Sequence, residues 1–271
     1  MAPLPDLMDR FDQVPLPLSV SKMEQFKDHF SNQAAAYARF RPGYPPELFS
    51  SIARLCENHR IALDCGTGNG QCAVGFTPYF KKVIAIDPSS EQIANAQKSS
   101  KVDYRVLPAE KTGLPAASLD LLTVAQALHW FDRAKFFAEA IRILAPGALF
   151  AAWTYGKFLV DGCQDELDHF YTNIIGPYWP PERASVDKGY ADIALPPEFE
   201  RVEGPSIFLS RDWTLEQLLG YVSTWSSVQK YREARSEDPV QILAEALQPL
   251  WSGESRLVQW PVSFLCGRKI Q

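Results

Sequence analysis

The stretch LDCGTGNG, residues 63–70, places a glycine-rich loop directly after a short apolar segment. A loop of this kind between a first strand and a helix lets a ligand approach the backbone closely. A dinucleotide-binding loop has the spacing G-x-G-x-x-G, but here Gly70 comes one position early and Gln71 stands where the third glycine is expected. The loop therefore indicates a ligand site whose ligand differs from a dinucleotide.

Two carboxylates indicate which ligand this loop binds. Asp64 lies two residues before Gly66, where its charge would repel a pyrophosphate and attract a cationic amine. Asp87 lies twenty-one residues after Gly66, at the end of the next apolar segment, and a carboxylate there can accept two hydrogen bonds from a ribose diol. S-adenosylmethionine carries an ammonium and a sulfonium group and no phosphate, so it fits. A tight turn without a ligand, the plain alternative, explains neither carboxylate.

Short apolar segments alternate with helical segments around the loop. Strands are expected over residues 61–65, 82–87, 102–107, 119–124 and 148–153. Capping residues such as Ser89 and Asp132 precede the helices between them. This alternation predicts an α/β fold with a parallel, doubly wound sheet that helices cover on both faces. A closing strand is expected over residues 257–266 and a further strand over residues 206–209.

The other segments differ in composition from this alternating core. Residues 1–21 are rich in proline and predict an extended lead-in, whereas residues 22–271 are expected to form a single domain. The proline- and aromatic-rich residues 156–200 are typical of an insertion. The predicted core covers residues 44–155 and 200–271. An N-terminal helical lid and a C-terminal helical cap are expected over the active site, from residues 22–43, 156–200 and 211–251.

Composition and charge disfavour several classes of function. The net charge of −5 and the pI of about 5.5 argue against a nucleic-acid-binding protein. The sequence has no apolar run long enough to span a membrane and no basic run suited to a membrane surface. Its five cysteines form no CxxC pair, which favours reduced thiols in a cytoplasmic protein over a disulfide framework or a zinc site. Neither a metal-binding motif nor the hydrolase motif G-x-S-x-G appears.

Several segments together resemble a known family. The loop LDCGTGNG, followed by VIAIDPS, is similar to the class I S-adenosylmethionine-dependent methyltransferases. Residues 37–45, 107–132 and 142–153 extend the similarity to the small-molecule branch that includes the trans-aconitate methyltransferases and related carboxyl methyltransferases. The resemblance covers about residues 22–155 and, more weakly, residues 211–231. It implies a Rossmann-like sheet of seven strands with the last strand antiparallel, and S-adenosylmethionine as cofactor with S-adenosylhomocysteine as product.

The resemblance also implies which residues hold each part of the cofactor. The glycine loop would hold the methionine part, the end of the second strand the ribose, the loop after the third strand the adenine, and the end of the fourth strand the sulfur. An N-terminal helix would fold over the cofactor and bring an arginine to its carboxylate; a surface ion pair is the alternative for that arginine. The residues implied for the methionine part are Asp64, Gly66, Thr67, Gly68 and Asn69, and those for the ribose are Asp87 and Pro88. Ala109 and Glu110 are implied for the adenine, and Ala125 and Gln126 for the sulfur. The residues of the N-terminal helix are Tyr37 and Arg41.

His129 follows the predicted fourth strand, at the sheet edge where ligands bind in doubly wound folds. Three roles are open for it: lining the pocket, acting as a general base, or packing as a structural histidine. A base is needed only if the methyl acceptor arrives protonated. The aromatic candidates for the pocket could equally fill the core. The candidate substrate-binding residues are His129, Trp130, Trp153, Tyr155, Tyr221, Ser223 and Trp225.

The function expected from these features is S-adenosylmethionine-dependent methyl transfer to a small molecule. The resemblance favours O-methylation of a carboxylate or a hydroxyl group by in-line displacement. Two alternatives stay open: an NAD-dependent oxidoreductase, and a non-enzymatic binding protein on a methyltransferase scaffold. The expected partner is a small-molecule substrate rather than nucleic acid or a membrane, and the protein is expected to be a monomer or a homodimer without a metal ion.

Overall fold

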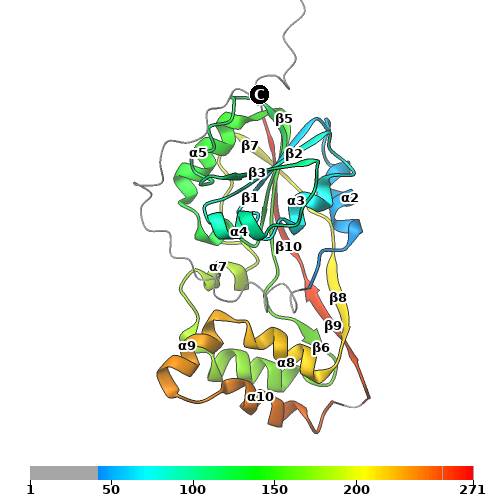
Figure 1. Ribbon diagram of the computed structural model, residues 1–271, viewed down its shortest axis with the longest axis vertical. Coiled ribbons are helices and arrows are strands. Elements are labelled where there is room, and N and C mark those ends of the chain that lie inside the picture. The colour runs from blue at the N-terminus through cyan, green and yellow to red at the C-terminus, as the bar shows by residue number, and fades with distance from the viewer. Residues whose placement is uncertain (1–41, 252, 271) are drawn as a thin grey trace, which may run out of the picture.

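A seven-stranded sheet forms the centre of the upper lobe in Figure 1, a computed structural model that describes residues 42–251 and 253–270. The strand order in the sheet is β3-β2-β1-β4-β5-β10-β7. Strands β1 to β5 are parallel to one another, and β10 is antiparallel to both β5 and β7. The bounds are β1 Ile61–Cys65, β2 Lys82–Asp87, β3 Val102–Val106, β4 Leu119–Ala125, β5 Leu144–Thr154, β7 Phe199–Val202 and β10 Ser263–Lys269. The predicted Rossmann-like fold with an antiparallel last strand is confirmed.

Helices cover both faces of this sheet, because its central strands are buried on both sides. Helix α5 (Arg133–Ile143) packs Phe136, Phe137 and Ala140 against one face. Helices α2 (Pro46–Arg54) and α3 (Gln71–Phe76) pack against the other. The short helix α4 (Ser90–Asn95) follows β2. The central sheet is thereby a rigid frame whose strand ends can position a site.

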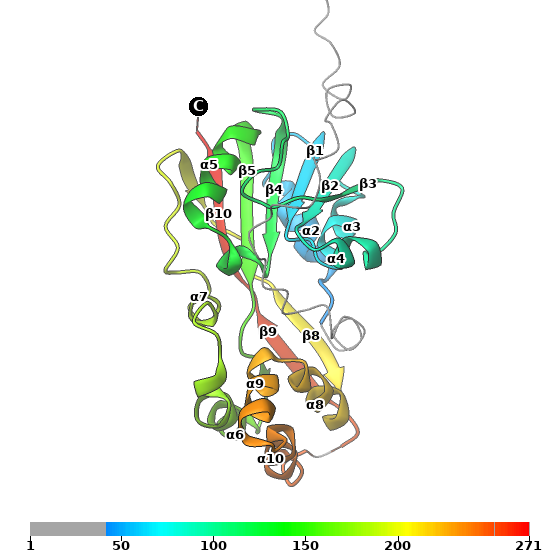
Figure 2. The ribbon, with the colours of Figure 1, turned by 60° about the vertical axis from the view of Figure 1, so that its left-hand side comes forward.

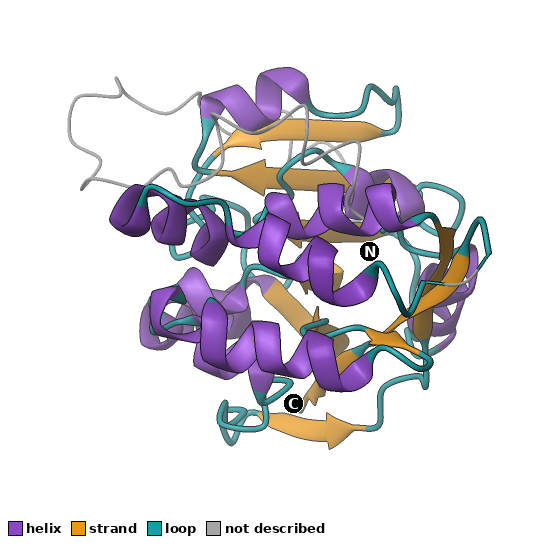
Figure 3. Ribbon diagram, turned by 90° about the horizontal axis from the view of Figure 1, so that it is seen from below, coloured by secondary structure: helices purple, strands orange, loops and turns teal. Residues whose placement is uncertain are grey.

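A second lobe, here called the cap, lies below the carboxyl ends of the parallel strands (Figure 1, Figure 2). It contains an antiparallel sheet in the order β6-β9-β8 and, seen from below, a layer of helices (Figure 3). Its core is aromatic and separate from the cores of the central sheet. The cap strands are β6 Leu159–Val160, β8 Phe208–Trp213 and β9 Arg256–Pro261; its helices are α6 Gln164–His169, α8 Leu215–Ser223, α9 Ser226–Arg235 and α10 Pro239–Leu247, with irregular helical turns at Phe170–Ile174 and Gly176–Tyr178.

The structure corrects several predicted strands. The single closing strand predicted over residues 257–266 is two strands, β9 in the cap and β10 in the central sheet, which meet at Val262. The strand predicted over residues 206–209 is β8, shifted towards the C-terminus. Strand β7 was not predicted, because it is short and half exposed at the sheet edge. Strand β5 begins at Leu144 rather than at residue 148. The predicted lead-in and N-terminal lid lie outside the described residues.

Helix α7 (Arg183–Asp187) connects the two lobes. It belongs to the predicted insertion and lies at the level between the lobes in both side views (Figure 1, Figure 2). Arg133, the first residue of α5, donates from Nη2 to Ser185 Oγ on α7 over 2.8 Å. The insertion is therefore attached to the central sheet next to the end of β4.

Candidate active site at the carboxyl edge of the sheet

The glycine-rich loop after β1 is held against the end of β2. The amides of Gly66 and Thr67 both donate to the carbonyl oxygen of Ile86, over 2.9 and 3.0 Å. Gly66, Gly68 and Gly70 have φ values of 67°, 53° and 77°, in the left-handed region that favours glycine. A Cβ on Gly66 would lie 2.7 Å from the Cβ of Ala127, and one on Gly70 would meet the hydroxyl of Tyr104. The loop is a tight backbone cradle that side chains would fill.

The buried carboxyl group of Asp64 fixes this loop through hydrogen bonds. Its side chain is 1% exposed, and its oxygens accept hydrogen bonds from the hydroxyls of Thr67 (2.6 Å) and Thr123 (2.9 Å). Burial raises the pKa of Asp64, and the hydroxyl donors oppose that rise. These contacts connect β1, the loop and β4. A direct contact of Asp64 with a cofactor ammonium stays a prediction.

Asp87, the last residue of β2, connects the loop to the position predicted for the ribose. Its Oδ2 accepts from the amide of Gly68 and its Oδ1 from the amide of Ser89, both over 2.9 Å. Each carboxylate oxygen accepts up to two hydrogen bonds, so bracing the loop is compatible with a ribose contact. The following helix α4 starts at the predicted cap, because Ser89 Oγ accepts from the amide of Gln92.

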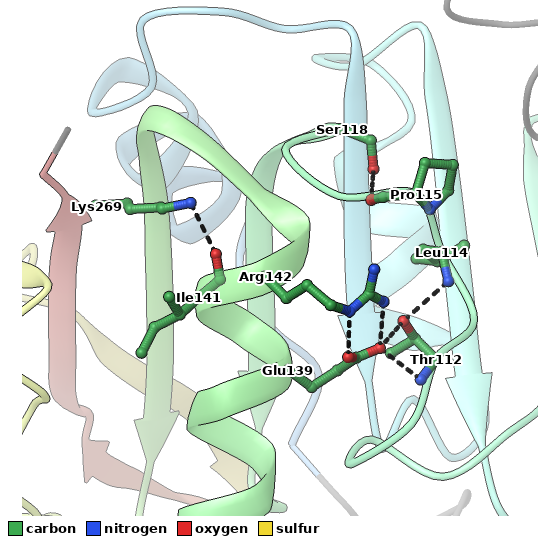
Figure 4. Close-up of polar contacts among 8 residues, drawn as sticks. All are labelled: Thr112, Leu114, Pro115, Ser118, Glu139, Ile141, Arg142 and Lys269. Carbon is green, nitrogen blue, oxygen red and sulfur yellow. Dashed lines mark hydrogen bonds and ion pairs between the residues drawn. The ribbon is translucent and has the colours of Figure 1, made fainter.

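The loop after β3, which carries Ala109 and Glu110, is fixed by a side chain of α5. Glu139 accepts hydrogen bonds from the backbone amide of Thr112 (2.8 Å) and from the guanidinium of Arg142 (2.7 Å), as Figure 4 shows. Glu110 accepts from the amide of Asp132 over 3.0 Å, beside the end of β4. The predicted adenine-binding loop is therefore held at the same edge of the sheet as the glycine loop.

Gln126 turns the chain at the end of β4. It adopts a φ of 57°, which is uncommon for a residue with a Cβ and marks a locally constrained backbone. Its Nε2 donates to the carbonyl of Tyr155 over 2.8 Å, and its Oε1 accepts from the hydroxyl of Thr154 over 2.5 Å. The end of β4 is thus fixed to the end of β5. This arrangement places Ala125 and Gln126 at the edge where the resemblance puts the cofactor sulfur.

His129 lies in the short helical turn Leu128–Trp130 directly after this bend. Its Nδ1 is 3.0 Å from the hydroxyl of Tyr190, a residue of the insertion. Burial, together with the positive charges of Arg183 and Arg133, lowers the pKa of His129 from 6.5 to about 3. In the described part of the chain Nε2 has no hydrogen-bond partner. At neutral pH His129 is therefore an uncharged imidazole and a weak base.

The other predicted substrate residues lie in three places. Trp130 lies beside His129, with ring centroids 4.9 Å apart. Trp153 is fully buried on the α2 face of the sheet, where it packs against Tyr44 and Phe264. The remaining three aromatic candidates belong to the aromatic core of the cap, and Ser223 Oγ donates to the carbonyl of Gly220 on its own helix. These three candidates are Tyr155, Tyr221 and Trp225. Substrate contacts by these residues stay predictions.

Sequence reasoning missed three polar residues near His129, namely Tyr190, Arg183 and Arg133. Tyr190 is 1% exposed and has a φ of 64°. Two of the three lie in the insertion, which has no regular hydrophobic period that would have placed them. Two predicted residues, Tyr37 and Arg41, lie outside the described residues.

Comparison with known proteins supports the S-adenosylmethionine site that the geometry indicates. A family model described as a methyltransferase domain matches residues 63–152. A Dictyostelium discoideum protein named as a methyltransferase is 37% identical over 255 residues, which cover 90% of this chain and 96% of the relative. The chain belongs to the class I S-adenosylmethionine-dependent methyltransferases. This membership decides against an NAD-dependent oxidoreductase.

Two further similarities support the methyltransferase assignment. A solved structure described as a type II methyltransferase from Anaeromyxobacter dehalogenans is 40% identical, with a TM-score of 0.80, and the match covers 85% of this chain and 99% of that one. A Saccharomyces cerevisiae protein named as an S-adenosylmethionine-dependent methyltransferase is 33% identical over 132 residues, 45% of each chain. The predicted enzyme class and cofactor are confirmed, whereas the trans-aconitate branch is not specifically supported.

The site of this methyltransferase fits S-adenosylmethionine. Three glycines with left-handed backbone form the loop, and it is flanked by the carboxyl groups of Asp64 and Asp87, which suit a cofactor without phosphate better than a pyrophosphate. When bound, the cofactor supplies a methyl group on a sulfonium centre. In the described ranges 42–251 and 253–270 no cluster of histidine, cysteine, aspartate or glutamate could hold a metal ion. None of the described helices is long and apolar enough to cross a membrane.

The low pKa of His129 predicts how stability depends on pH. The unfolded chain binds this proton near pH 6.5, whereas the folded protein binds it only near pH 3. Stability is therefore complete above pH 6.5 and is lost as the pH falls towards 3. Wild type should lose up to about 2 kcal/mol more unfolding free energy than His129→Gln between pH 7 and pH 5. Urea denaturation at both values measures this, and equal losses would show that His129 titrates normally.

Proposed function

We propose that this methyltransferase methylates an oxygen atom of a small molecule, a carboxylate or a hydroxyl group. The observation that carries the proposal is the state of His129, the histidine at the carboxyl edge of the sheet. It is neutral and weakly basic, and two arginines lie close enough to lower its pKa. An acceptor that arrives already ionised needs no base. Between the two acceptors, these surroundings favour the carboxylate.

The position of the cap supports a small substrate. The cap lies below the carboxyl ends of the parallel strands (Figure 2), and its aromatic core is buried. Displacement at a sulfonium methyl has a neutral leaving group, so the enzyme contributes mainly alignment and exclusion of water. A cap over the strand ends serves both purposes. The acidic net charge of −5 also disfavours a nucleic-acid substrate.

In this proposal, different residues of the chain hold the cofactor and position the acceptor. Asp87 and the glycine loop would hold the cofactor, and Gln126 fixes the strand ends beside it through Thr154 and Tyr155. Tyr190 fixes the ring of His129 through Nδ1. The other ring nitrogen, Nε2, can then orient the acceptor by a hydrogen bond. In this proposal His129 positions the acceptor and does not remove its proton.

Methyl-labelled cofactor with a small-molecule extract tests the acceptor class. Alkali hydrolyses a methyl ester and releases labelled methanol, whereas a methyl ether is stable. We expect an alkali-labile product, and we expect His129→Gln to lower kcat less than 10-fold, since general bases contribute about 10²–10⁴-fold. A stable ether together with a loss above 100-fold in His129→Gln would instead identify a hydroxyl acceptor with His129 as base. Wild type without extract controls for hydrolysis of the cofactor.

A further inference from the structure

Arg183, the first residue of α7, has an unusual set of contacts. Its Nε donates to the hydroxyl of Tyr171 over 2.8 Å and to Oδ1 of Asp187 over 3.1 Å. Its guanidinium carbon lies 4.5 Å from the ring centroid of Trp179, a cation–π geometry. The side chain is only 18% exposed. Arg183 is therefore held in one orientation by three contacts before any ligand binds.

The guanidinium lies beside the predicted acceptor site. A Cβ on Gly156, the residue after Tyr155 at the end of β5, would be 3.6 Å from Nη2 of Arg183. On the side of β4, the charge of Arg183 contributes to the low pKa of His129. Arg183 thus lies where the cap approaches the ends of β4 and β5. Gly156 has no side chain that would cover the guanidinium from this side.

The outer edge of the guanidinium has donors that the protein does not use. Both of its hydrogen bonds come from Nε, and within residues 42–251 and 253–270 no acceptor bonds to Nη1 or Nη2. These two nitrogens carry four N–H groups in a planar fork that matches the two oxygens of a carboxylate. Neighbouring rings of Tyr171, Trp179 and Trp225, with centroids 5.3–5.7 Å apart, lower the local polarity, which strengthens ionic pairing.

We propose that Arg183 binds an anionic oxyacid group of the substrate, a carboxylate in the simplest case, through Nη1 and Nη2. This inference rests on the proposed function, because it places the anion in the same acceptor site. An ion pair with Asp187 alone is the structural alternative. That pair uses only Nε and leaves Nη1 and Nη2 without an acceptor among the described residues.

Kinetics of three arginine variants with fractionated acceptors test the proposal. The small-molecule extract is separated on an anion exchanger into anionic and neutral fractions, and each is assayed with methyl-labelled cofactor. Wild type should label acceptors of the anionic fraction. At low acceptor concentration Arg183→Gln should be slower by about 100-fold, the loss expected when a buried charged partner is removed, and a high concentration should restore most of the rate. Arg183→Lys keeps the charge but not the fork, so it should lie between.

Arg54→Gln is the matched control, because Arg54 lies at the C-terminal end of α2, outside the proposed site, and donates to the hydroxyls of Ser50 and Ser51 on its own helix. It should behave as wild type. The affinity of each variant for S-adenosylhomocysteine shows whether the fold is intact, and this affinity should not change. O-methylation of neutral acceptors only, or an unchanged rate in Arg183→Gln at low acceptor concentration, overturns the role of Arg183 and leaves the proposed function standing. A product methylated on nitrogen, sulfur or carbon would instead overturn the proposed function.

Discussion

Replacing Asp87 with alanine is expected to weaken binding of S-adenosylmethionine and S-adenosylhomocysteine by about 100-fold, which corresponds to about 2.7 kcal/mol. The change removes the charged acceptor for the ribose and the brace for the amides of Gly68 and Ser89. A hydrogen bond to a charged group contributes about 1.5–3 kcal/mol, so the loss of two ligand bonds, partly replaced by water, gives this magnitude. Isothermal titration calorimetry with both ligands measures it.

Asp103→Asn provides the control for this experiment. Asp103 is also a carboxylate of the central sheet, but it lies on β3 and pairs with Arg105 over 2.6 Å and with Lys82 over 3.5 Å. Its loss should leave both affinities unchanged. An Asp87→Ala variant that binds S-adenosylhomocysteine as tightly as wild type would contradict the ribose-binding role. Asp87→Asn keeps one acceptor oxygen and should show an intermediate affinity.

Replacing Gly66 with alanine is expected to abolish detectable cofactor binding and to destabilise the protein by about 2–4 kcal/mol. The new Cβ would be 2.7 Å from the Cβ of Ala127, in a backbone with a φ of 67°. The glycine loop must then move away from the bend after β4. This bend lies next to the residues predicted to contact the cofactor sulfur. Urea denaturation without ligand gives the stability change, and calorimetry gives the affinity.

Gly68→Ala separates steric overlap from backbone strain. Gly68 also has a positive φ, of 53°, but the nearest atom to its Cβ position is Oε1 of Gln92 at 3.9 Å. The cost of a left-handed residue alone is about 1–2 kcal/mol. Gly66→Ala should therefore be clearly less stable than Gly68→Ala. Equal stability of the two variants would show that contact with Ala127 does not shape the loop.

The central sheet could be predicted because the helix-capping residues and the apolar segments in the sequence agree with the burial seen in the structure. The helix-capping residues Ser89 and Asp132, predicted from the sequence, both act as caps: Ser89 accepts from the amide of Gln92, and Asp132 accepts from the amide of Lys135. Strands β1, β2 and β4 are short apolar runs buried on both faces, a pattern that few alternatives share, whereas β3 at the sheet edge is only half-buried. Local sequence therefore predicted the order of the parallel strands and of the helices between them, but not the start of β5 at Leu144.

The correction at the closing strand has a long-range cause. Residues 256–269 form one extended run, which local pattern alone cannot divide. The run is divided at Val262 because its first part pairs with β8 and β6 in the cap, whereas its second part pairs with β5 and β7 in the central sheet. The amide of Val262 donates to Ile207 at this division. Only the strands that pair with β9 and with β10 show that residues 256–269 belong to two different sheets.

The site was predictable where it follows strand ends and not where it depends on the insertion. Asp87 is the last residue of β2 and His129 follows β4, so the topology alone puts them at one edge of the sheet. Tyr190 contacts His129 from 61 residues away, and no local pattern predicts that contact. Alternation along β5 could have refined one prediction: Phe150 and Ala152 face α5, so Trp153 must face the α2 side, in the core.

The most direct test of the proposed function is the chemical environment of the transferred methyl group. The enzyme is incubated with cofactor carrying a carbon-13 methyl group and with a small-molecule extract, and the products are examined by proton–carbon correlation NMR. The proposal predicts a new signal in the O-methyl region, carried by a small molecule and absent without enzyme. A new signal in the N-, S- or C-methyl region, or label found only on macromolecules, would contradict it.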